Sequence, residues 1–203
     1  MKTFFISLVT LCALALSSVG SPAAAVDIQK DNLYPRVKFV TNKGEMIVEL
    51  DRWRAPVTVD HFLTHVVSGS YDSTLFHRVV DNFVVQGGGY KTDWTPLPEG
   101  DTVINESGNG LPNRFGTIAM ARQQDPHSAR RQFYFNTNDN DSLNPNPRRW
   151  GYAVFGRVVE NEELLRELMA VATDFNEEVN FPDVPVEPIV LMRVELLPEP
   201  QAE

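Results

Sequence analysis

Residues 75–90 read LFHRVVDNFVVQGGGY, and this stretch decides the fold. Two short apolar runs, 75–80 and 83–86, predict β-strands that an Asp-Asn turn joins and three glycines end. Alternation along the first run places Phe76, Arg78 and Val80 on one face of its strand. A guanidinium among apolar side chains is costly without a partner, so Arg78 is the first candidate functional residue.

Further motifs along the chain extend this pattern. Phe-His-Arg at 76–78 is followed by Phe83, five residues after the arginine, and by Gln-Gly-Gly at 86–88. Gln-Phe-Tyr at 132–134 and Val-Phe-Gly at 154–156 come later. In this combination the chain resembles the cyclophilin family of peptidyl-prolyl cis-trans isomerases. The resemblance implies a mainly β fold, an eight-stranded closed antiparallel barrel with two capping α-helices.

The first 25 residues predict a cleaved secretory signal peptide. Lys2 forms a short basic region, residues 4–16 form an apolar run, and residues 23–25 form a small-residue cleavage motif. The apolar run is short for a membrane span, so an uncleaved anchor is the disfavoured alternative. Cys12 is not expected to carry a lipid, because the bulky Leu11 precedes it. We therefore expect export to the periplasm, with secretion as the alternative.

The composition describes a soluble acidic domain without disulfides. Cys12 is the only cysteine, so the chain after the leader must rely on an ordinary hydrophobic core. Removing residues 1–25 takes away one of the 18 basic residues and none of the 27 acidic ones, which moves the net charge from −9 to −10. This balance argues against nucleic acid, or a membrane after leader removal, as the main partner.

Hydrophobic patterns also place the elements around the central stretch. Residues 35–50 alternate on both sides of a glycine turn and predict a hairpin. A helix is expected to begin with Thr58 as its N-cap, with Val57 and Phe62 as a hydrophobic staple, and to stop at Gly69.

Many short strands and only two helices favour a closed antiparallel barrel over a parallel α/β sheet. A second helix is expected at 162–171, and the stripe that it buries is Leu164, Leu165, Leu168 and Met169. The remaining predicted strands are 117–121, 132–136, 153–158 and 189–196. The expected organisation is a signal peptide at 1–25, a lead-in at 26–34, one isomerase domain at 35–198 and a frayed tail at 199–203.

The resemblance implies catalysis of rotation about X-Pro imide bonds, which needs no nucleophile, metal or cofactor. Arg78 is the expected catalytic residue, because its guanidinium stays charged and Gln86 can orient it. By correspondence with the family, the substrate-binding residues are Phe83, Val84, Gln86, Ala121, Arg122, Gln132, Tyr134, Leu143 and Tyr152. The expected partners are proline-containing segments of exported proteins that are folding, and the enzyme is expected to be a monomer.

Three residues depart from the family pattern. Val84 replaces the usual Met, Tyr134 replaces the usual Phe, and Ser142 replaces the Trp or Phe that normally precedes Leu143. Because the aromatic ring at this position contacts cyclosporin in cytosolic eukaryotic members, the resemblance implies weak cyclosporin binding at most. The loop 122–131 has one residue more than the cytosolic eukaryotic pattern and resembles the exported bacterial cyclophilins.

Alternative functions have weaker support in the sequence. A peptide-binding module or chaperone without turnover is the main rival, and Ser142 alone favours it. A secreted hydrolase would need Asp125, His127 and Ser128 to form a triad, but three nearly adjacent loop residues cannot build the usual orienting chain.

Metal and phosphate sites are also disfavoured. His61 and His65 lack a third ligand in a metalloprotease spacing, and the Asn/Asp-rich run 136–144 lacks the glycine and glutamate of a calcium loop. The glycines at 87–89 are not followed by a phosphate-binding helix.

Overall fold

The computed structural model describes residues 28–199. The expected signal peptide at 1–25 and nearly all of the expected tail at 199–203 lie outside the described residues. The elements in chain order are β1 (Arg36–Thr41), β2 (Gly44–Leu50), α1 (Pro56–Val67), β3 (Thr74–Phe76), β4 (Arg78–Val80), β5 (Val84–Gly87), β6 (Thr117–Met120), β7 (Phe133–Asn136), the 3-10 helix η1 (Asp141–Leu143), β8 (Val154–Glu160), α2 (Glu162–Met169), β9 (Thr173–Asn176), β10 (Phe181–Pro185) and β11 (Ile189–Leu196).

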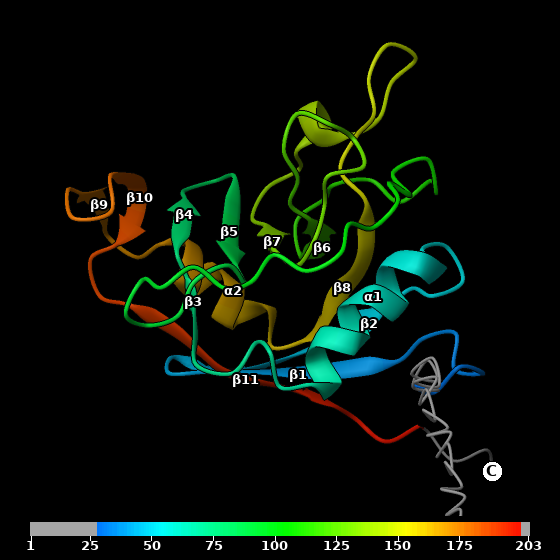
Figure 1. Cartoon of the computed structure of the whole chain (residues 1–203), viewed down its shortest axis with the longest axis horizontal. Helices are drawn as coiled ribbons and strands as arrows, with labels where there is room; N and C mark the ends of the chain where they lie inside the picture. The colour runs from blue at the N-terminus through cyan, green and yellow to red at the C-terminus, as the bar shows by residue number, and fades with distance from the viewer. Residues whose placement is uncertain (1–27, 200–203) are drawn as a thin grey trace, which may run out of the picture.

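The main sheet is antiparallel throughout and curls into a nearly closed barrel (Figure 1). Its strand order is β3-β11-β1-β2-β8-β6-β7-β5-β4. The two end strands, β3 and β4, follow each other in the chain with only His77 between them. The prediction of a mainly β barrel with two helices is therefore confirmed, with nine strands in place of eight because one expected strand is split in two.

The split corrects the prediction of a single strand at 75–80. β3 pairs with β11 on one side of the break, and β4 pairs with β5 on the other. Phe76 and Val79 both enter the core, so the inward face changes across His77. Strict alternation predicted that Arg78 and Phe76 share a face. This prediction is wrong, because the inward face changes between them. The break lets one segment leave one edge of the sheet and join the other edge.

The predicted hairpin at 35–50 is confirmed as β1 and β2, whose inward residues are buried. The barrel interior that they help to line is filled by aromatic rings in edge-to-face and tilted contacts. Phe39 lies 5.6 Å from Phe133 and 5.2 Å from Phe135, and Phe62 of α1 lies 5.1 Å from Phe155, measured between ring centroids. These rings supply much of the buried apolar area and fix the positions of β7 and β8.

The start of α1 differs from the prediction. The helix begins at Pro56, where a missing N–H costs nothing. Thr58 lies inside the first turn, and its N–H and hydroxyl both donate to the Glu106 carboxylate, at 2.8 Å and 2.6 Å. Val57 is 48% exposed and forms no hydrophobic staple with Phe62. A distant carboxylate thus replaces the local cap that the sequence suggested.

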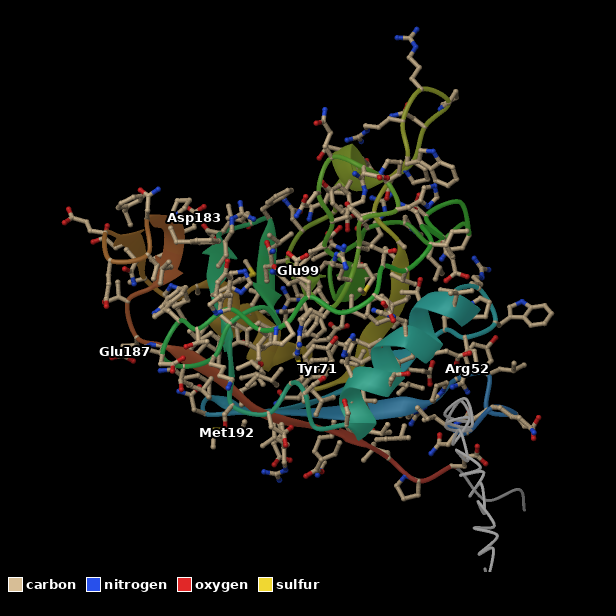
Figure 2. All side chains as sticks on the ribbon, viewed as in Figure 1. Arg52, Tyr71, Glu99, Asp183, Glu187 and Met192 are labelled. Atoms are coloured by element: carbon tan, nitrogen blue, oxygen red, sulfur yellow. The ribbon has the colours of Figure 1, made fainter. Side chains whose placement is uncertain are left out.

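The lead-in is fastened to the barrel by Arg52, whose side chain is almost fully buried (Figure 2). Its guanidinium donates to the carbonyl of Ile28 at 2.8 Å and to that of Asn32 at 2.7 Å. It also pairs with Asp60 of α1 at 2.8 Å. One buried cation therefore satisfies carbonyls of an irregular segment that has no strand partner of its own among the described residues.

The C-terminal part contains one element that the sequence did not predict. α2 buries Leu164, Leu165 and Leu168 as expected, although it ends at Met169 and that side chain is only partly buried. After it, β9 and β10 form a separate two-stranded sheet. This hairpin lies beside β4, at the edge of the barrel that carries Arg78 (Figure 1).

Candidate active site

Nine of the ten predicted site residues line one pocket of about 230 Å³. These residues are Arg78, Phe83, Val84, Gln86, Ala121, Arg122, Tyr134, Leu143 and Tyr152. The tenth, Gln132, lines an adjoining pocket of about 240 Å³ that shares Gln86, Ala121 and Arg122 with the first. The two pockets therefore form a continuous surface across β4, β5, β6 and β7.

The floor of the first pocket is apolar and separate from the barrel core. Buried side chains from four neighbouring strands form it, namely Val84, Ala119, Tyr134 and Val154. Phe83, Leu143 and Tyr152 pack around its rim. This setting suits a compact apolar group such as a proline ring, because its entry removes apolar surface from water on both sides.

Tyr134 keeps the apolar wall and adds a polar anchor beneath it. Its hydroxyl donates to Asn113 Oδ1 at 2.8 Å, inside the protein. Burial raises the pKa of Tyr134 well above the usual value, so the phenol stays neutral. The substitution of Tyr for the family's Phe therefore presents a ring to the pocket while its hydroxyl is satisfied elsewhere.

Arg78 is held within a series of polar side chains. It lies opposite Gln86 in the β4–β5 ladder, and its Nη1 donates to Gln86 Oε1 at 3.4 Å. Gln86 Nε2 in turn donates to Gln132 Oε1 at 3.0 Å. The Gln132 side chain lies directly over Gly89, where any Cβ would approach its amide nitrogen to 2.5 Å. The third glycine of the motif thus makes room for this amide.

Sequence reasoning missed one residue of this series. Asp183 on β10 places its Oδ2 3.5 Å from Arg78 Nε. No motif of the family resemblance includes it, and its hairpin has no clear apolar alternation, since β9 is mostly exposed. The only available signal was the acidic residue itself, which nothing in the sequence connects to Arg78, 105 positions earlier.

Arg122 contributes as part of the pocket wall. Its guanidinium lies 4.4 Å from the centroid of the Tyr152 ring. It also donates to the carbonyls of Gly151 at 3.2 Å and Trp150 at 3.0 Å. Because loop carbonyls and a ring face already engage this cation, its stem and the Tyr152 ring form a fixed wall.

Ser142 lies in η1, on the outer side of the pocket. Its side chain is exposed, while its neighbour Leu143 reaches the pocket. The Leu143 carbonyl accepts a hydrogen bond from the Tyr152 N–H at 3.0 Å, which holds η1 against the start of β8. The serine therefore lowers the rim and leaves the apolar floor intact.

The alternative sites do not assemble. His127 Nδ1 accepts a hydrogen bond from the Asn105 N–H, and Ser128 Oγ donates to the Asp125 carbonyl. Neither contact is the serine-to-histidine hydrogen bond that a triad needs. His61 contacts the Arg130 carbonyl through Nε2. Within residues 28–199, no three His, Cys, Asp or Glu side chains gather as a metal site, and no helix is long and apolar enough to cross a membrane.

Comparisons with known proteins show the family to which the chain belongs. A family model described as cyclophilin type peptidyl-prolyl cis-trans isomerase/CLD matches residues 36–195, and the chain belongs to this family. Peptidyl-prolyl cis-trans isomerase cyp18 of Streptomyces antibioticus is 43% identical over 164 residues, which cover 79% of this chain and 98% of that protein. Peptidyl-prolyl cis-trans isomerase B of Escherichia coli is 39% identical over 161 residues, covering 78% and 97%.

A solved structure shows the same fold. The cyclophilin type isomerase of Cryptosporidium parvum superposes with a TM-score of 0.68 at 24% identity, covering 82% of this chain and 99% of that one. The protein is thus a peptidyl-prolyl cis-trans isomerase, and it acts on proline-containing peptides.

Proposed function

We propose that the pocket lined by Arg78 and the apolar floor is the catalytic site, and that the enzyme serves the folding of exported proteins in the periplasm. The observation that supports the site is the position of a fixed guanidinium at the edge of an apolar pocket. The observation that supports export is the leader-like composition of residues 1–25.

The geometry suits imide rotation, because the barrier to this rotation comes from the partial double bond of the imide. An X-Pro bond in its planar ground state has partial double-bond character, with a barrier of roughly 18–20 kcal/mol. In the twisted transition state the imide nitrogen becomes pyramidal, and its lone pair can accept a hydrogen bond. A donor fixed near this nitrogen therefore stabilises the transition state more than either planar isomer.

The transition-state stabilisation that turnover requires is moderate. Uncatalysed X-Pro rotation takes tens of seconds, and turnover in milliseconds needs about four orders of magnitude, or roughly 5–6 kcal/mol. One preorganised donor in a site of this type contributes about 2.7–4 kcal/mol. The floor residues Val84 and Tyr134, with Leu143 of the rim, supply the remainder by holding the proline ring while the acyl side rotates.

Arg78→Ala tests the site. We expect it to lower kcat/KM on an Ala-Ala-Pro-Phe tetrapeptide by about 100- to 1000-fold, with unchanged far-UV circular dichroism. Arg78→Lys should recover little, because an ammonium lacks the planar fork. Arg36→Ala is the matched control, since it removes an exposed arginine that pairs with Glu49 on the outside of the barrel.

Full activity in Arg78→Ala would refute the proposed role of this residue. Equal loss in Arg36→Ala would show that a change of charge, and not the position of Arg78, is responsible. Treatment with a metal chelator should leave the rate unchanged.

The export proposal has its own test. We expect cleavage after Ala25, so that the mature protein begins at Val26 and carries no lipid. Intact mass of the protein recovered from the periplasm of an expressing bacterium measures this directly. A mass that matches residues 1–203, or a lipid on Cys12, would contradict the proposal.

A further inference from the structure

We propose that Asp183 is a positioning residue that holds the Arg78 guanidinium in its catalytic orientation. This inference rests on the proposed catalytic role of Arg78. It adds to the site a carboxylate from the β9–β10 hairpin, outside the residues that line the pocket.

Asp183 and Gln86 hold Arg78 through different nitrogens. Asp183 Oδ2 lies 3.5 Å from Nε, and Gln86 Oε1 accepts from Nη1 at 3.4 Å. The guanidinium is planar and rigid, so two contacts on different nitrogens restrict its rotation far more than one. Figure 2 shows Asp183 on β10, which lies beside β4, the strand of Arg78.

The backbone of Asp183 has an unusual conformation that directs its side chain. Its φ is +57°, in the left-handed region that most residues avoid. The β9–β10 ladder is irregular here, since Phe181 pairs with Asn176 and the next pair is Val184 with Asp174. Such a bulge re-aims a side chain out of its normal alternation. Backbone strain of this kind is often found at functional sites.

Aromatic packing fixes this hairpin against the strand that carries Arg78. The ring of Phe181, two residues before Asp183, lies 5.6 Å from that of His77, 5.8 Å from that of Tyr90 and 6.4 Å from that of Trp94. His77 directly precedes Arg78 in the chain. The position of the carboxylate relative to the guanidinium is therefore set by packing between rings as well as by the ion pair.

Two effects of the carboxylate oppose each other. Its negative charge weakens the positive potential that Arg78 presents to the imide nitrogen, and its contact restricts a long side chain with many rotamers. The guanidinium stays charged in either case, so its alignment decides whether a proton reaches the lone pair. The side chains are 29% and 42% exposed, and a pair of this exposure contributes little to stability. We therefore assign Asp183 to positioning and not to holding the fold.

Asp183→Asn is the appropriate test, because asparagine fits the left-handed backbone and keeps the shape of the side chain. Glu178→Gln is the matched control, since it removes one charge from the exposed loop of the same hairpin. We expect Asp183→Asn to lower kcat about three- to fivefold while KM changes less than twofold, as measured by exchange NMR on the tetrapeptide. The Arg78 Nε–Hε resonance should shift and broaden.

A kcat equal to that of wild type, or a resonance that does not change, would overturn the inference. So would an equal loss of kcat in Glu178→Gln. If Asp183→Asn folds poorly, Asp183→Gly, which also tolerates positive φ, replaces it with the same expected results.

The double variant separates this inference from the proposal on which it rests. In the Arg78→Ala background, Asp183→Asn should have no further effect on the residual rate, because the group that it orients is absent. The same three- to fivefold loss in that background would show that Asp183 acts on the fold, which overturns positioning. Full activity of Arg78→Ala would instead refute the proposed function itself.

Discussion

Gly89→Ala offers a sharp test of how the site orients its polar side chains. An added Cβ would lie 2.5 Å from Gln132 Nε2 and 2.7 Å from its Cδ, both far inside van der Waals contact. The atoms in the way belong to the end of a flexible side chain, so Gln132 can move aside without disturbing the backbone. Its hydrogen bond with Gln86, 3.0 Å long, would then be lost.

The size of the effect follows from that one bond. A net hydrogen bond is worth about 0.5–1.5 kcal/mol, which corresponds to a roughly two- to thirteenfold loss of kcat/KM. Stability should hardly change, because replacing Gly by Ala at a compatible backbone stabilises a protein by about 0.4–1 kcal/mol and offsets the lost bond. Gly89 meets this condition, since its φ is not positive.

Gly87→Ala is the matched control two positions earlier. A Cβ there would lie 2.8 Å from a ring carbon of Phe76 and 3.1 Å from the Leu75 carbonyl oxygen, which are core and backbone atoms. Overpacking of this kind costs about 1–3 kcal/mol of unfolding free energy. The tetrapeptide assay and urea unfolding measure the two quantities. Unchanged kcat/KM in a folded Gly89→Ala protein, or a loss of stability equal to that of Gly87→Ala, would refute the reasoning.

Two further predictions concern the rim and the strand break. We expect weak cyclosporin binding. Ser142→Trp should tighten this binding at least tenfold, about 1.4 kcal/mol, because it restores an aromatic ring to the rim. Nanomolar binding by the native protein, or no gain in affinity in the variant, would contradict this prediction. Burial lowers the pKa of His77 to about 4, with a smaller contribution from the charge of Arg78 and an opposing one from the Leu75 backbone. Between pH 6.5 and pH 4 the unfolded chain thus binds a proton that the folded protein does not, so stability falls as pH falls. Between pH 7 and pH 5, His77 should account for a loss of about 2 kcal/mol in the free energy of unfolding. His77→Gln should remove that part of the pH dependence of stability, measured by urea unfolding. An unchanged pH dependence would show that His77 titrates normally.

Much of the barrel could be predicted because its strands bury one face. β2 alternates throughout, β1 and β11 alternate over part of their length, and β11 has the predicted bounds, 189–196. Alternation is a reliable signal where apolar residues face a core and polar residues face water. The same rule fails at His77, because Phe76 before the break and Val79 after it both belong to the core but lie on different strands.

The helix start and the second hairpin could not be predicted for a different reason. α1 is capped by Glu106, which is 48 residues beyond Thr58, and only the folded chain brings the two together. β9 is largely exposed and β10 is short, so their residues show little periodicity. Their position depends on Phe181 packing against rings from other segments. Contacts made over such separations leave no local pattern in the sequence.

The family resemblance named ten candidate site residues, and the structure brings nine of them to one pocket. An isomerase of this type needs no group that gains or loses a proton, so its chemistry depends on holding one donor still. Arg78, the proposed donor, has neighbours on both sides. Asp183 contacts Nε, and Gln86, itself bonded to Gln132, contacts Nη1. Motif matching finds Gln86, because this residue and its glycines are adjacent in the chain. It misses Asp183, because a bulge on a distant hairpin brings that residue to the arginine. A motif can therefore point to a candidate donor and still describe only half of the contacts that hold it.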